Sequence, residues 1–288
     1  MFRTTLIAAT LSIAFAGAHA AQPLQVKVYN ADGNSFNVNS TLVYGEKEAM
    51  VIDAGFTRAD ALRIAANVLD SGKELKTIYV SQADPDYYFG VETIKEIFPT
   101  AEVVTTPAVL EKINAKLAGK IAFWGPKMGA NAPRTPVLPK AISGTTLTVD
   151  GQTVEIRGTT GPLAHRPYAW IPSIKAVVGN IGVFGANMHV WTADTQTVAE
   201  RSAWVAQLDE MAALQPALVV PGHMPAGTAL DVSNVTYTKG YLQAFEKNAA
   251  ATKTSAELID AMKKAYPAAP MGLSLDIGAK VNKGEMKW

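Results

Sequence analysis

Buried strands and amphipathic helices alternate along the first half of the chain. The apolar run EAMVID at 48–53 predicts a buried strand, and apolar residues at helical spacing predict a helix over 57–72, capped by Thr57. The same unit recurs as a strand at 75–81 and a helix at 89–98. Because such alternation builds layered sheets covered by helices, it predicts the α/β class.

The second half starts again with strands and ends in helices. Asp150-Gly151 is a strong turn signal and predicts a hairpin over 145–158. Further strands are expected at 24–30, 35–45, 101–106, 168–172, 175–180 and 216–223, and helices at 107–116, 197–214 and 237–266, the last split near Thr252. This order predicts two similar half-domains packed sheet to sheet, with the helices outside.

The segment from Ala122 to Pro139 has a different composition. It is rich in Gly and Pro, which predicts no regular element there. It is either a linker or a loop over a site, and its aromatic pair, Phe123 and Trp124, favours the packed loop. Trp124 is a candidate pocket residue, and core packing is the equal alternative.

The first twenty residues predict a secretory signal peptide of bacterial type. Arg3 precedes a short apolar run from Leu6 to Ala16, and Ala18-His19-Ala20 fits the rule for cleavage before Ala21. The apolar run is too short for a stable membrane anchor. We therefore expect a periplasmic or secreted protein, free of the membrane after cleavage, with residues 21–288 forming a single domain that ends in helices.

Composition narrows the range of partners and of metal ligands. The chain has 26 basic and 25 acidic residues, a balance that gives no reason to expect nucleic acid as a partner. A small-molecule substrate is expected instead, and the sequence indicates no oligomeric state. There is no cysteine, so neither a disulfide nor a thiolate ligand is available. After signal cleavage the histidines are His165, His189 and His223.

Four segments, in order and spacing, carry a resemblance to a known family. They are NSTLVYGEKEAMVIDAGF, KTIYVS with its following loop, AWIPSIKAVVGN and LQPALVVPGH, and together they span roughly residues 35 to 230. With these segments the chain resembles the metallo-β-lactamase superfamily of metal-dependent hydrolases. The resemblance implies the four-layer αβ/βα sandwich of that fold.

The ligand positions of the family are largely substituted. Its main loop reads Ser/Thr-His-x-His-x-Asp-His, whereas this chain has Ser81-Gln82-Ala83-Asp84-Pro85-Asp86-Tyr87. Among the metal-ligand positions of that loop, only Asp86 matches. The next family histidine is replaced within TTGPLAHR, and Asn180 stands at the bridging aspartate position. His223 keeps the last histidine of the family. The conventional two-zinc centre is therefore not expected here.

Two states of the site remain open from the sequence. One is a single divalent ion, Zn²⁺, Mn²⁺ or Fe²⁺, held by Asp84, Asp86 and His223. The other is no ion at all. The aspartates are alternatively caps of the helix that begins near Tyr88, and His223 is alternatively a histidine satisfied by backbone in a tight turn.

Other side chains are candidates for supporting or catalytic roles. Tyr87 is expected to stabilise an oxyanion, and His189 to stabilise charge, bind metal or act as a general base. Both have packing or surface roles as alternatives. Asp53 is expected to orient the main loop from below. The remaining residues expected in or around the pocket are Gln82, Asn180, Trp124 and Trp191.

These residues support two functional hypotheses. The first is an exported hydrolase with a reduced, carboxylate-rich, mononuclear site whose activated water attacks an ester, lactone, amide or phosphoester. The second is a metal-free small-molecule-binding protein or pseudoenzyme that uses the same cleft.

Overall fold

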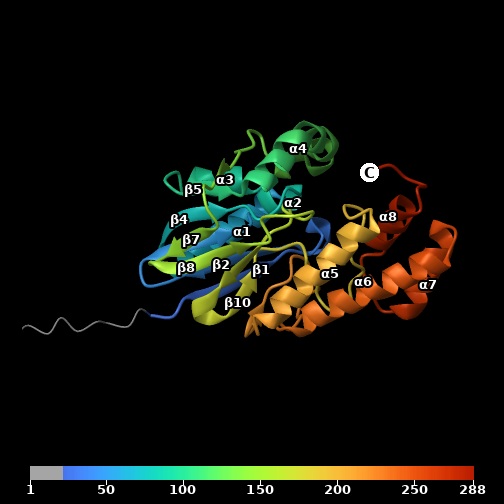
Figure 1. The fold of residues 1–288 in the computed structure, drawn as a ribbon. Coiled ribbons are helices and arrows are strands. Elements are labelled where there is room, and N and C mark those ends of the chain that lie inside the picture. The colour runs from blue at the N-terminus through green and yellow to red at the C-terminus, as the bar shows by residue number, and fades with distance from the viewer. Residues whose placement is uncertain (1–21) are drawn as a thin grey trace, which may run out of the picture.

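Two β-sheets pack face to face, with helices on their outer faces (Figure 1). The structure, a computed structural model, describes residues 22–288. The expected signal peptide at 1–20 and its cleavage site before Ala21 lie outside the described residues. Figure 1 shows α3 and α4 on one side of the molecule and the C-terminal helices, in orange and red, gathered away from them. This is the αβ/βα sandwich that the sequence predicted.

The first sheet has six strands in chain order. They are β1 (Gln25–Asn30), β2 (Asn39–Tyr44), β3 (Glu48–Ile52), β4 (Glu74–Tyr79), β5 (Glu102–Thr105) and β6 (Lys140–Ala141). The first three strands are antiparallel, and β3 to β6 run parallel. The carboxyl ends of β3 and β4 therefore meet at one edge, which is where ligand sites of parallel sheets form.

The second sheet has five strands in the order β11-β10-β9-β8-β7. They are β7 (Thr146–Val149), β8 (Gln152–Arg157), β9 (Tyr168–Ile171), β10 (Ala176–Val178) and β11 (Leu218–Val219). The predicted hairpin is confirmed, because β7 pairs with β8 around Asp150 and Gly151, both at positive φ. The last predicted strand is shorter than expected, since it covers only Leu218 and Val219, and His223 pairs only in isolated bridges with Val38 and Phe184.

One apolar core joins the two sheets. It contains Met50, Ile52 and Tyr79 from the first sheet and residues such as Val154 and Ile171 from the second, all of them buried. Burying these faces removes large apolar areas from water, which is the main favourable term in folding. The predicted sheet-to-sheet packing is therefore confirmed.

The helices of the first half are α1 (Arg58–Ser71), α2 (Pro85–Tyr88), α3 (Val91–Ile97) and α4 (Pro107–Met128), with 3-10 turns at Gly33–Ser35 and Gly129–Asn131. Thr57 and Asp60 form a capping box at the start of α1, and Gly72 ends it in the left-handed conformation. These two ends agree with the prediction because both depend on residues close in sequence.

The prediction for 107–139 was wrong in part. The helix expected to end at Lys116 continues to Met128, through Gly125 and Pro126. Packing outweighs the local helix breakers, because Trp124 lies edge-on to the rings of Phe36 and Phe56 at 5.5 and 5.3 Å. The irregular stretch begins only after the 3-10 turn that follows α4.

The helices of the second half are α5 (Val198–Ala213), α6 (Ser233–Ala251), α7 (Ser255–Ala265) and α8 (Gly272–Asn282), with a 3-10 turn at Pro172–Ile174. The predicted split near Thr252 is confirmed, but α8 lies beyond the predicted tail. Within 22–288, no helix is long and apolar enough to cross a membrane.

Candidate functional site

Asp53 links the carboxyl ends of the parallel strands β3 and β4, next to the site. It follows β3 at φ 66°, where a short polar residue is tolerated, and its side chain is buried. Its carboxyl oxygens accept hydrogen bonds from the backbone amide and the hydroxyl of Ser81, each at 2.8 Å. The loop after β4 is therefore held against the end of β3.

Asp86 and His223 meet across the two half-domains. Asp86 lies in the short helix α2, and His223 follows β11. The His223 Nε2 atom lies 3.5 Å from Asp86 Oδ2, and His223 Nδ1 lies 2.9 Å from the Phe36 carbonyl oxygen. Because that carbonyl only accepts, Nδ1 carries the hydrogen, and the Nε2 lone pair faces Asp86.

Asp84 is engaged elsewhere. It precedes α2 without making a side-chain cap hydrogen bond, so the capping alternative does not describe it. Its Oδ1 atom accepts a hydrogen bond from Lys120 Nζ of α4 at 2.5 Å. The structure thus brings Asp86 and His223 together and pairs Asp84 with an ammonium group.

Burial and neighbouring charge set the protonation of these groups. Burial, together with the nearby Asp84 charge, raises the pKa of Asp86 to about 7. Burial would also raise the pKa of Asp84, but the Lys120 ammonium outweighs it and holds that pKa below the ordinary value. Burial lowers the pKa of His223, and burial raises the pKa of Asp53 to about 8. Asp86 and His223 are therefore both shifted toward their neutral forms.

The donor set does not fit the metal that the family resemblance implied. A catalytic ion needs about three protein ligands around it. In the described part of the chain, no group of three or more His, Asp or Glu side chains is placed to hold an ion. Asp86 and His223 converge, but the third expected ligand, Asp84, bonds Lys120 instead.

Three of the predicted site residues are tied into the surrounding backbone. The hydroxyl of Tyr87 is buried and directed at the Asn180 carbonyl oxygen, 3.3 Å away. The Asn180 side chain bonds the Val220 carbonyl and the Val183 amide, at 2.9 and 2.8 Å. The Gln82 amide donates to the Pro167 carbonyl at 2.8 Å. The Tyr87 and Gln82 bonds join loops of the two half-domains, and the Asn180 side-chain bonds hold the second half together.

The remaining predicted residues lie further out. His189 is buried, its Nδ1 atom lies 3.0 Å from the Tyr241 hydroxyl, and burial lowers its pKa. Its ring contact in the described structure is also with Tyr241 of α6, away from Asp86 and His223. Trp124 belongs to the aromatic cluster that includes Phe36 and Phe56. Trp191 donates to Asp194 at 2.6 Å and packs against Trp288, and these two partners line a cavity.

That cavity, of about 200 Å³, opens beside Asp84. It is lined by the main loop, α4, the loop between β8 and β9, the loop between β10 and α5, the first turn of α5 and the C-terminal residue. The lining residues are Gln82, Ala83, Asp84, Lys112, Lys116, His165, Arg166, Ile181, Asp194, Gln196, Glu200 and Trp288. The cavity is therefore rich in charged groups of both signs.

Sequence reasoning missed Lys120 and Arg166. Lys112, Lys116 and Lys120 recur every four residues, which places them on one face of α4. That spacing was a usable signal, but it was obscured because the helix was expected to end at Lys116. Arg166 lies in an irregular loop, and no local sequence pattern predicts which residues it contacts.

Comparison with known proteins agrees with this fold. Residues 33–173 match the family model of the metallo-beta-lactamase superfamily. A metallo-beta-lactamase family protein from Thermus thermophilus is similar in structure, with a TM-score of 0.62 at 17% identity, over 91% of this chain and 93% of that one. A metallo-beta-lactamase from Pontibacter korlensis gives a TM-score of 0.52 at 16% identity, over 78% and 97%. No curated protein matches the chain.

Residues 33–173 place the chain in the metallo-β-lactamase superfamily, and the solved structures show the same fold. Membership in this superfamily indicates a hydrolase in general terms. The structural neighbours share too little sequence to carry a substrate over to this chain, so its chemistry must be argued from its own side chains.

Proposed function

We propose that the chain is an exported hydrolase of small molecules, periplasmic or secreted, in which Asp86 and His223 form the acid–base pair. The observation that carries this proposal is the 3.5 Å approach of His223 Nε2 to Asp86 Oδ2, with the other ring nitrogen held by the Phe36 carbonyl. An imidazole whose tautomer and orientation are fixed in this way is prepared for proton transfer.

The pair can activate water without an ion. A water molecule beside it transfers a proton to the pair and attacks an ester, lactone, amide or phosphoester, and the proton then passes to the leaving group. The side chains of Asp86 and His223 are each 9% exposed. The neighbouring Asp84 side chain opens directly onto the cavity.

A second candidate function is binding without catalysis. It rests on the Lys120–Asp84 pair, in which the ammonium group engages a carboxylate that was expected to bind metal. In this alternative the cavity retains a small molecule, and the Asp86–His223 pair only holds the two half-domains together.

Hydrolysis assays on the chelator-treated mature chain separate these functions. The substrates are an ester, a lactone, an amide and a phosphoester, and the variants are Asp86→Asn and His223→Gln. We expect turnover to survive chelation and to fall about 10²- to 10⁴-fold in either variant. Asp209→Asn is the matched control, because that carboxylate is exposed and pairs only with Lys239.

Activity that requires added metal would overturn the acid–base assignment, as would activity that both substitutions leave intact. Retention of a small molecule with no turnover of any of the four substrate classes would establish the binding function instead.

A further inference from the structure

Among residues 22–288, Arg166 is a buried charge with no ion-pair partner. Its exposed fraction is 4%, its Nε atom has no hydrogen-bond partner, and its side chain lines the cavity beside Asp84. In the described part of the chain, no carboxylate lies within ion-pair distance of its guanidinium group. Burying a charge in this way is costly unless something pairs with it.

The chain holds this guanidinium group in a fixed position. The Arg166 amide donates to the Leu163 carbonyl at 2.7 Å, and the Gln207 side chain donates to the Arg166 carbonyl at 3.0 Å. The Arg166 Cζ atom lies 4.4 Å from the ring centroid of Trp204. An arginine stacked on an aromatic ring keeps its planar hydrogen-bonding edge free for another group.

The acidic groups of the same cavity already have other partners. The two carboxyl oxygens of Asp194 accept the indole N–H groups of Trp191 and Trp288, at 2.6 and 3.0 Å. Glu200 accepts the amide and the hydroxyl of Thr197, both at 2.9 Å, in the capping box of α5. Asp84 accepts from Lys120. Arg166 is thus left as the buried cation of the cavity that has no carboxylate at ion-pair distance in the described part of the chain.

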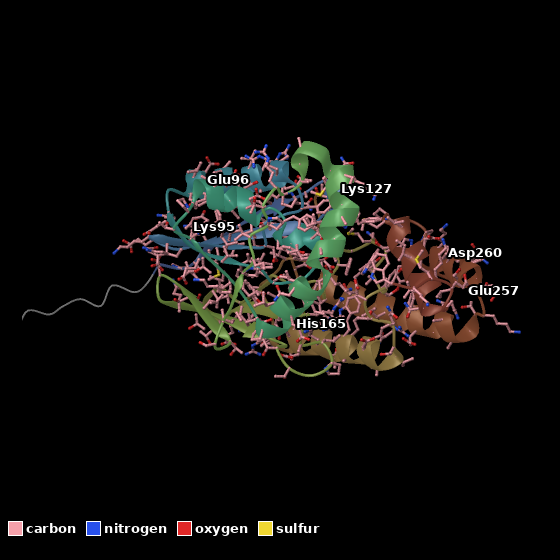
Figure 2. All side chains as sticks on the ribbon, turned by 90° about the horizontal axis from the view of Figure 1, so that it is seen from above. Lys95, Glu96, Lys127, His165, Glu257 and Asp260 are labelled. Atoms are coloured by element: carbon pink, nitrogen blue, oxygen red, sulfur yellow. The ribbon has the colours of Figure 1, made fainter. Side chains whose placement is uncertain are left out.

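The α4 wall adds positive charge. Lys112 and Lys116 lie one helical turn apart and both line the cavity. Lys116 has only a distant contact with Asp194, at 3.8 Å, and is 49% exposed. Figure 2 shows His165, the neighbour of Arg166, beside the N-terminal half of α4, with Lys127 at the other end of that helix.

We propose that Arg166 anchors the oxyanion group, a carboxylate or a phosphate, of a small-molecule ligand in this cavity, with Lys112 and Lys116 contributing charge from the α4 side. The planar fork of arginine matches both groups bidentately. A cavity of about 200 Å³ suits a small anion rather than a polymer. This inference rests on the proposed function and names the class of its substrate. Binding of the anion can be measured without any hydrolysis.

Calorimetric titration of the mature chain at low salt tests the proposal. The probes are inorganic phosphate and succinate, titrated separately against a chloride-matched blank. We expect saturable binding of at least one probe, weakened at least about tenfold in Arg166→Gln and less in Arg166→Lys, which keeps charge but loses the fork. Arg134→Gln, at an exposed arginine outside the cavity, should bind as the unmodified chain does.

The double variant Lys112→Gln/Lys116→Gln provides a second test, because both lysines are exposed and their loss should not unfold the chain. We expect it to weaken binding about three- to tenfold. Absence of saturable binding of either probe overturns the proposal, as does binding that both Arg166→Gln and the double variant leave unchanged. Tighter phosphate binding indicates a phosphate-bearing ligand, and tighter succinate binding a carboxylate. Because these titrations need no hydrolysis, a failed Asp86–His223 assignment leaves their outcome unaffected.

Discussion

Replacing Lys120 with methionine should destabilise the chain and at the same time give it affinity for a divalent metal. Lys120 and Asp84 are mostly buried, with side-chain exposures of 20% and 29%, and their atoms lie 2.5 Å apart. Lys120→Met keeps the length of the side chain but leaves Asp84 without its counter-charge. Asp84 then becomes free to join Asp86 and His223 as a third ligand.

The size of the loss follows from the burial of the pair. A fully buried ion pair costs about 3–5 kcal/mol when one partner is removed, whereas an exposed pair costs about 0–1 kcal/mol. The Lys120–Asp84 pair lies between these limits, so we expect a loss of about 2–3 kcal/mol. For a chain of this size that corresponds to a fall of roughly 4–12 °C in the thermal midpoint.

Thermal unfolding with and without zinc or manganese tests both halves of this prediction. At a metal concentration about 100-fold above Kd, binding to the folded variant restores about 2.7 kcal/mol, which approximately cancels the loss. Lys120→Met/Asp84→Asn lacks the third ligand and should gain nothing from metal. Lys127→Met, at an exposed lysine of the same helix, should behave like the unmodified chain.

The reasoning is refuted if the unmodified chain shows the same metal-dependent rise as Lys120→Met. It is also refuted if Lys120→Met neither loses stability nor responds to metal, because the ion pair would then not be what occupies Asp84.

Three further substitutions test the structure around the site. Asp53→Asn should flatten the pH dependence of unfolding. In the unmodified chain the pKa of Asp53 is about 8 when folded and 3.8 when unfolded, so the native state holds an extra proton and its stability falls as the pH rises from about 4 to 8. Urea midpoints measured across that range should show this fall in the unmodified chain and a smaller one in the variant. Gly222→Ala should lower the free energy of unfolding by about 3 kcal/mol or more in chemical denaturation. The added Cβ would lie 2.2 Å from the Asn180 carbonyl oxygen and 2.6 Å from the Tyr87 hydroxyl. A variant of unchanged stability would contradict this close packing. Tyr87→Phe should lower the free energy of unfolding by only about 0.5–1.5 kcal/mol and leave turnover within about threefold, because the Tyr87 hydroxyl faces the Asn180 carbonyl. A fall in kcat of more than about 100-fold would instead assign the Tyr87 hydroxyl to oxyanion stabilisation.

Features fixed by neighbouring residues were predictable from the sequence. The Thr57 cap, the Gly72 end of α1 and the Asp150-Gly151 hairpin each depend on a few adjacent positions. The approach of Asp86 to His223 was also expected, because both positions match the family's ligand motifs. What local patterns could not give was the extent of α4, since only the packing of Trp124 against Phe36 and Phe56 decides whether the helix continues past Gly125.

Because α4 was predicted too short, the cation that pairs with Asp84 was not found from the sequence. A helix ending at Lys116 leaves Lys120 in a loop, where nothing assigns it a partner. With α4 extended, Lys112, Lys116 and Lys120 lie on one face of the helix, and Lys120 reaches Asp84. Arg166 was hidden for a different reason, because its surroundings come from segments far apart in the chain and no short pattern brings Trp204 beneath it.

Charge balance explains how the substituted site remains folded. Three carboxyl groups gather at the ends of β3 and β4, and buried carboxylates need a cation, a proton or several donors. In a metal centre the ions supply that positive charge. Here Asp84 receives an ammonium group, Asp53 receives the Ser81 donors, and Asp86 lies beside His223. Lys120 neutralises Asp84, and Arg166 lines the same cavity with no carboxylate at ion-pair distance among residues 22–288. This distribution of charge is what the proposed anionic ligand rests on.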